Sequence, residues 1–150
     1  MNWLEKEVTN IELSKKLKEL GFPQDKGLFW VYIWKYPENK YIWELRLLEE
    51  PLYDETLGIT EYIKAYTCSE LGEYLRNDCP KNYEVFYTQP FDDGFMVCSI
   101  DKDGFSEEYP DTFDKIEANS RAKAVIWLRR TGCIRFENKK KDNKTSKVRK

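Results

Sequence analysis

The sequence predicts an α+β fold: a mainly antiparallel sheet, built from a β-hairpin and a three-strand meander, with about three helices packed on it. Short runs of aromatic and β-branched residues are typical of strands. Turn sequences join most of these runs directly, as in antiparallel sheets. Helical repeats of apolar residues occur three times, and no long crossover between parallel strands is evident.

Capping boxes predict where two helices begin. Thr9 and Glu12 stand three residues apart before leucines at helical spacing, so we expect a helix over residues 10–20. Thr67 and Glu70 repeat this arrangement and begin a second helix, which ends near residue 77. In such a box each partner's side chain accepts a hydrogen bond from the other's backbone amide.

Periodicity predicts the remaining elements. A third helix is expected over residues 119–130, with an inward face that carries Ala122, Val125, Ile126 and Leu128. Alternating or short apolar runs predict strands at residues 28–34, 41–48, 62–66, 82–88, 95–100 and 105–108.

Composition excludes several classes of protein. The chain has 25 basic and 27 acidic residues and a net charge of −2, unlike a basic nucleic-acid module or an acidic disordered chain. It has no histidine, so imidazole-based catalysis and the common catalytic zinc sites are excluded. No C-x-x-C pair occurs among Cys68, Cys79, Cys98 and Cys133. We therefore expect no metal site and no cofactor.

Targeting and nucleotide-binding signals are also missing. The N-terminus has no apolar signal region, and the longest apolar run, residues 28–34, is far shorter than the roughly 18 residues of a membrane helix. Neither a P-loop nor a dinucleotide-binding glycine motif is present. We expect a cytoplasmic protein with reduced thiols and no membrane contact.

The end of the chain differs from the rest. Residues 137–150 contain seven basic and two acidic residues and one apolar residue, Val148. Such a segment has nothing to bury, so we expect a disordered basic C-terminal tail. The preceding residues, 1–136, fit a single α+β domain.

Three segments carry distinctive motifs. Residues 13–24 end a helix in LGFPQ before an aromatic strand, residues 65–75 begin a helix with TCSEL, and residues 118–128 read ANSRAKAVIWL. Together they resemble a group of small uncharacterised bacteriophage and prophage proteins, over about a quarter of the chain. The chain departs from the group at residues 64–66, where the group favours Ala-Ala-Pro, and in its basic tail. The resemblance implies a shared fold, a viral origin and an accessory protein that binds a component of the host bacterium.

Aromatic residues are the most informative candidates for function, with 5 Trp, 10 Tyr and 8 Phe in the chain. The first expected strand carries them on both faces, so a face without helices could stack bases or sugars, or anchor a protein interface. Alternatively, this strand is central and buried on both faces. The candidate ligand- or partner-binding residues are Trp30, Tyr32, Trp34, Trp43 and Arg46.

Acid pairs and one cysteine are weaker candidates. Asp92 and Asp93 precede a glycine, as in ordinary turns, and the adjacent Glu107 and Glu108 point to opposite faces of a strand. Cys68 begins a helix, where a thiol pKa is lowered, although a small buried apolar role explains it as well. We assign no catalytic residue.

Three functions stay open. The first is a non-enzymatic accessory protein that binds a host protein through the aromatic strand residues or the 49–60 loop, with a tail that folds on binding. The second is a protein that sequesters a small nucleotide signal of host defence in an aromatic pocket rimmed by basic side chains. The third is an enzyme that uses carboxylates alone. A flat exposed aromatic patch would favour a protein partner, and a closed pocket would favour a small nucleotide. Two convergent buried carboxylates would favour an enzyme. The net charge of −2 disfavours nucleic acid as a partner. The sequence is compatible with more than one oligomeric state.

Deletion of residues 137–150 should leave the melting temperature unchanged, because the segment has almost no apolar surface to pack. Thermal unfolding followed by circular dichroism measures this directly. A fall of more than about 4 °C would contradict the expectation, since such a shift corresponds to about 1 kcal/mol of lost stability in a domain of this size.

Overall fold

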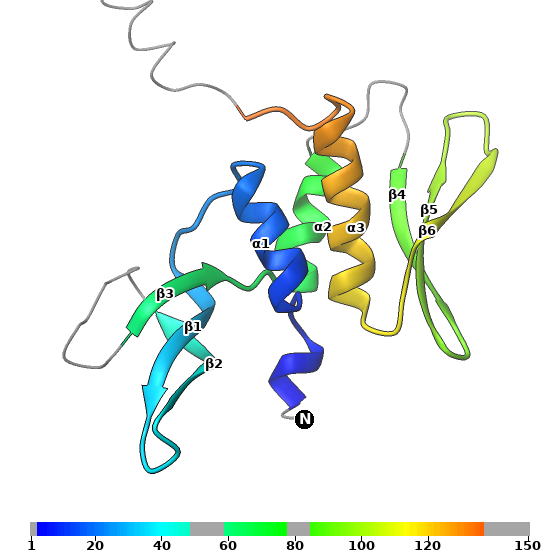
Figure 1. Ribbon diagram of the computed structural model, residues 1–150. Helices are drawn as coiled ribbons and strands as arrows, with labels where there is room; N and C mark the ends of the chain where they lie inside the picture. The colour runs from blue at the N-terminus through cyan, green and yellow to red at the C-terminus, as the bar shows by residue number, and fades with distance from the viewer. Residues whose placement is uncertain (1–2, 49–58, 78–84, 137–150) are drawn as a thin grey trace, which may run out of the picture.

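The computed structural model describes residues 3–48, 59–77 and 85–136 and confirms the α+β class (Figure 1). All of its strand pairs are antiparallel. The elements are the 3₁₀ helix η1 (Trp3–Lys6), the helices α1 (Ile11–Glu19), α2 (Cys68–Asn77) and α3 (Glu117–Arg130), and the strands β1 (Gly27–Lys35), β2 (Lys40–Leu48), β3 (Ile59–Lys64), β4 (Val85–Phe91), β5 (Gly94–Ile100) and β6 (Ser106–Asp114).

The strands form two sheets of three rather than one sheet. One sheet has the order β2-β1-β3 and contains the predicted hairpin, and the other has the order β4-β5-β6 and is the predicted meander. The three helices lie between the two sheets (Figure 1). The main core joins the helices to the second sheet, and its largest fully buried members include Leu17, Phe22, Tyr66, Leu71, Val97, Val125, Leu128 and Ile134.

Helix α1 begins after Asn10, so the predicted capping box of Thr9 and Glu12 is wrong. The Asn10 side chain accepts a hydrogen bond from the Leu13 amide at 2.8 Å, which is the role of an N-cap. Thr9 is fully buried, and its hydroxyl accepts a hydrogen bond from the Tyr66 amide at 3.0 Å. Burial against a distant segment thus outweighs the local capping preference of the threonine.

The second capping box is confirmed. The Thr67 amide donates to Glu70 Oε1 at 3.0 Å, and the Glu70 amide donates to Thr67 Oγ1 at 3.2 Å. Helix α3 starts two residues earlier than expected, and all four of its predicted inward residues are buried. Strand β3 lies nearer the N-terminus than the sequence predicts, and β6 is longer, extending to Asp114.

Polar contacts tie the first helix to the last. The Asn10 amide donates to Asn119 Oδ1 at 2.9 Å, and Arg129 Nε donates to the Leu20 carbonyl at 3.1 Å. Leu17 of α1 belongs to the same buried cluster as the apolar residues of α3. The first helix therefore completes its packing only against a segment more than a hundred residues later in the chain.

The sheet β2-β1-β3 has separate apolar clusters and joins the helices through a narrow junction. The indole Nε1 of Trp30 donates to the Thr9 carbonyl at 2.8 Å, and the Ala65 amide donates to the Leu28 carbonyl at 2.8 Å. An isolated antiparallel bridge pairs Val8 with Thr67.

Some sequence predictions lie outside the described residues. These are the tail at 137–150, Cys79 and residues 49–58 of the 49–60 loop. Within the part of the chain that the structure describes, no helix combines the length and apolar character needed to cross a membrane.

Replacing Leu17 by Ala should lower the free energy of unfolding by about 2–5 kcal/mol, because the leucine is fully buried in the main core. Urea unfolding measures the change. The exposed Lys16 of the same helix is the control, and Lys16→Ala should change the free energy of unfolding by less than about 0.5 kcal/mol. Equal effects of the two substitutions would mean that α1 does not pack as described.

Candidate functional site

Side chains of β1 and β2 form an aromatic surface on one face of the first sheet. The register places Tyr32 opposite Trp43 and Trp34 opposite Tyr41, so these four side chains share a face. Tyr36 follows in the turn between the strands. We call these five residues the aromatic face.

Ring contacts hold the aromatic face together. The Tyr32 ring stacks on Tyr41 with centroids 5.1 Å apart and lies 5.0 Å from Trp43. The Trp34 ring meets Tyr41 edge-on at 5.0 Å and Tyr36 at 6.2 Å. Offset and edge-to-face pairs of this kind are favourable beyond the area that they bury. The side chains are therefore ordered before any partner arrives.

The aromatic face is only partly covered. Tyr36 is 79% exposed and Tyr41 is 41% exposed, and the other three side chains are half-buried. Helix α1 contributes Lys15, whose ammonium lies 5.3 Å from the centre of the Trp43 ring. The opposite face of β1 is buried, with Phe29, Val31 and Ile33 in a cluster of their own.

Two of the five predicted site residues are not part of the aromatic face, although Trp30 shares its side of β1 and Trp43 packs against the cluster that contains Trp30. Trp30 is 7% exposed and belongs to the junction with the helices, through its hydrogen bond to Thr9. Arg46 pairs in register with Phe29, so it lies on the opposite face of the sheet. The structure therefore brings together Tyr32, Trp34 and Trp43, and the sequence analysis did not select Tyr36 and Tyr41. The cross-strand pairing that adds them depends on hairpin register, which a period-two pattern alone does not give.

Arg46 is also occupied by a neighbouring carboxylate. Its Nε lies 2.7 Å from Glu44 Oε2, and Lys35 Nζ lies 3.0 Å from Glu44 Oε1. Partial burial opposes ionisation of Glu44, but the hydrogen bonds from Lys35 and Arg46 outweigh it and hold the pKa of that carboxyl below its usual value. This charged group lies behind the aromatic face rather than beside it.

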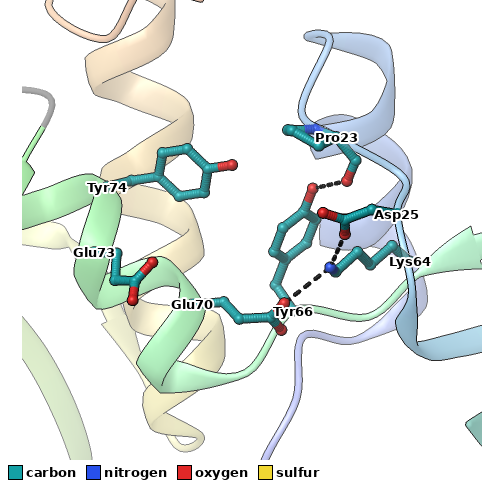
Figure 2. Close-up of a pocket in the computed structure, with 7 residues that line it drawn as sticks. All are labelled: Pro23, Asp25, Lys64, Tyr66, Glu70, Glu73 and Tyr74. Atoms are coloured by element: carbon teal, nitrogen blue, oxygen red, sulfur yellow. Dashed lines mark hydrogen bonds and ion pairs between the residues drawn. The ribbon is translucent and has the colours of Figure 1, made fainter. Parts of the chain in front are cut away.

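A cavity of about 260 Å³ lies at the junction between the first sheet and the helices (Figure 2). It centres on Lys64, the last residue of β3, whose side chain is 4% exposed. The lysine ammonium pairs with Asp25 and with Glu70 Oε2 at 2.8 Å, and it donates to the Lys26 carbonyl at 3.0 Å. The other lining residues are Pro23, Tyr66, Glu73 and Tyr74.

The polar groups at the centre of this cavity are already paired. The three ammonium protons of Lys64 match its three acceptors, and Glu70 Oε1 accepts from the Thr67 cap. The Tyr66 hydroxyl donates to the Pro23 carbonyl, and burial raises the pKa of Tyr66. Lys64 thus connects the end of β3 to the start of α2 and to the loop before β1. This arrangement does not offer the convergent free carboxylates that carboxylate-only catalysis requires.

The pKa of Lys64 follows from these contacts. Burial disfavours the charged ammonium, but hydrogen bonds to Asp25 and Glu70 outweigh it, so the pKa of Lys64 is raised above its usual value. Sequence reasoning missed this lysine because it ends an otherwise ordinary strand. Glu70 could have indicated a buried cation nearby. One of its carboxylate oxygens is used in the capping box, and the other can accept from a cation.

The remaining candidates from the sequence are scattered. Asp92 and Asp93 are exposed in the β4–β5 turn, and Glu107 and Glu108 are exposed on β6. Burial raises the pKa of the Cys68 thiol to about 11, so the lowered pKa suggested by its place at a helix start does not occur.

A basic cavity of about 220 Å³ lies between α2 and β4 and is lined by Arg76, Arg121, Tyr87 and Thr88, among others. The Arg121 guanidinium already donates to Thr88 Oγ1, to the Cys68 carbonyl and to Glu117. The Arg121 guanidinium therefore already has partners within the protein.

Comparison of the chain with protein-family models, with curated proteins and with solved structures finds no match.

Replacing Lys64 by Met should lower the free energy of unfolding at pH 7 by about 2–3 kcal/mol, because two partly exposed carboxylates lose a buried partner. Since folding raises the lysine pKa, its contribution is full below the unfolded pKa of about 10.4 and declines as the pH rises through the folded value. The difference between wild type and variant should therefore shrink in alkaline solution.

Urea unfolding of both proteins at pH 7 and at several values above pH 10 measures this difference. The exposed Lys26 provides the matched control, since Lys26→Met removes the same charge without the buried contacts. A difference that stays constant or grows with pH would contradict the assignment.

Proposed function

We propose that this protein acts by binding another protein, and that the aromatic face of the β1–β2 hairpin is the contact surface. The observation that carries the proposal is the ordered, half-exposed cluster of Tyr32, Trp34, Tyr36, Tyr41 and Trp43. The motifs shared with small phage proteins favour a host bacterial protein, met in the cytoplasm, as the partner.

The chemistry of the aromatic face suits a protein partner. Tryptophan and tyrosine are enriched among the residues that contribute most to protein interfaces, because they bury a large area at low cost in side-chain entropy. Here the rings already support one another, so less freedom is lost on binding. The hydroxyl groups of three tyrosines add polar contacts at the rim.

A small nucleotide is the second candidate, and the geometry supports it less. The aromatic residues form a face of a sheet, and four cavities among the described residues are lined by other side chains. The arginine that the sequence analysis assigned to the pocket rim lies on the other face. A closed pocket with convergent polar groups is the usual form of a small-molecule site.

A photo-reactive phenylalanine at position 36 should form a discrete adduct with a bacterial protein other than the chain itself, because Tyr36 is 79% exposed beside the other rings. Phe105 provides the matched control position, since it is 73% exposed in the turn between β5 and β6, at the other sheet. Mass spectrometry of the adducts from a bacterial lysate reads out the difference. Equal labelling from both positions would contradict the proposal.

Replacing Tyr41 by Ala should then weaken binding of the purified partner by about 30-fold or more, as expected for a residue worth at least about 2 kcal/mol at an interface. Replacing Phe105 by Ala should leave the affinity within about threefold. Isothermal titration calorimetry measures both values. An unchanged affinity for Tyr41→Ala would exclude the aromatic face as the contact surface.

A further inference from the structure

Among the residues that the structure describes, the two sheets have four outer strand edges, and three of them are blocked against pairing with another strand. Strand β4 contains Pro90 and strand β6 contains Pro110, and proline cannot donate to a neighbouring strand. The outer edge of β3 is occupied by side chains, because the Lys64 amide donates to Gln24 Oε1 at 2.8 Å and the Tyr62 carbonyl accepts from Lys18 Nζ at 3.0 Å. Such devices are how proteins prevent unwanted edge pairing.

Strand β2 carries none of these devices. It pairs with β1 over all nine residues in unbroken register, and it contains neither proline nor glycine. On its other side no strand pairs with it among the described residues. Leu47, near its end, is 74% exposed. A long, regular edge of this kind is a template for another strand.

We propose that β2 pairs with β2 of a second copy of this chain, antiparallel, about a two-fold axis at Leu45. Residues that face each other across such a pair lie on the same face of the joined sheet. In this register Leu45 faces its own copy, Glu44 faces Arg46 of the second copy, Trp43 faces Leu47, and Ile42 faces Leu48. Over residues 42–48, each apolar residue thus meets an apolar residue, and each charge meets its opposite.

Neighbouring registers are worse. A two-fold axis at Glu44 places this carboxylate against its own copy, and an axis at Trp43 places Lys40 against Arg46 and Ile42 against Glu44. Like charges directly opposite one another in a sheet are destabilising. The charge pattern of β2 therefore selects both the second copy as the partner and the axis at Leu45.

The contacts already present within one chain support this register. Glu44 and Arg46 lie two residues apart on the same face, with Nε and Oε2 2.7 Å apart, and Lys35 adds a second cation. Pairing joins two such groups into one network across the axis. It also covers the exposed Leu47 side chain with Trp43 of the other copy, and it places two aromatic faces on one side of a six-stranded sheet.

Sedimentation velocity over a range of protein concentrations tests the pairing, which does not depend on the proposed host partner. Wild type should reach twice the 18.0 kDa chain mass. Glu44→Arg and Arg46→Glu each place like charges opposite one another, so each should raise the dimer dissociation constant about tenfold or more. Glu107→Arg on β6 is the matched control, because it makes the same charge change at another edge and should leave dimerisation unchanged.

Mixing the two charge variants is the decisive step. In the mixed dimer the introduced arginine of one chain would face the introduced glutamate of the other, and the remaining native Arg46 would face the remaining native Glu44. Association should therefore return to the wild-type level. Within each chain the like charges stay together, so a purely structural role of the Glu44–Arg46 pair would not be rescued. Leu47→Asp, at a site 74% exposed, should also weaken the dimer, and at concentrations where both proteins are monomeric its melting temperature should equal that of the wild type.

A wild-type monomer at all concentrations would overturn the proposal. So would a dimer that survives the single charge changes, or a mixture of the two variants that fails to associate. A monomeric chain that instead binds an extended peptide along β2 would assign the edge to a different partner.

Discussion

The buried ammonium of Lys64 is the interaction on which the arrangement of the molecule depends. It joins the end of β3, the start of α2 and the loop before β1, and these are the segments through which the first sheet meets the helices. The first sheet shares little apolar core with the rest of the protein. Directional polar contacts, rather than a continuous hydrophobic core, therefore hold the hairpin in its orientation.

The exposed aromatic face follows from this architecture. Because the junction is narrow, the helices cover the Trp30 end of the sheet and leave the hairpin end open. Helix α1 reaches this side of the sheet with Ile11, which packs against the Trp30 cluster, and with Lys15, which lies over the Trp43 ring. The opposite face of β1 is buried in its own cluster, so the strand is rigid without help from the open face. The outer side of the aromatic face, with Tyr36 and Tyr41, is therefore left exposed.

Local chemistry predicted much of the fold, and long-range packing decided the rest. The Thr67–Glu70 box and the inward residues of α3 depend on neighbours within a few residues, and the sequence predicted both. Thr9 was misjudged because a residue far away in the chain, Tyr66, competes for its hydroxyl. The division into two sheets, the membership of the aromatic face and the partners of Lys64 all depend on strand pairing and tertiary contacts, which periodicity does not encode.

The tie between α1 and α3 has a consequence for synthesis on the ribosome. The strands of the first sheet are adjacent in sequence and have their own apolar cluster, so they can pair soon after they emerge. Helix α1 emerges earlier still, yet the Asn10 amide and part of the apolar surface of its leucines are paired only when α3 is complete. Helix α1, made near the start of the chain, thus completes its packing only after the last helix has been made.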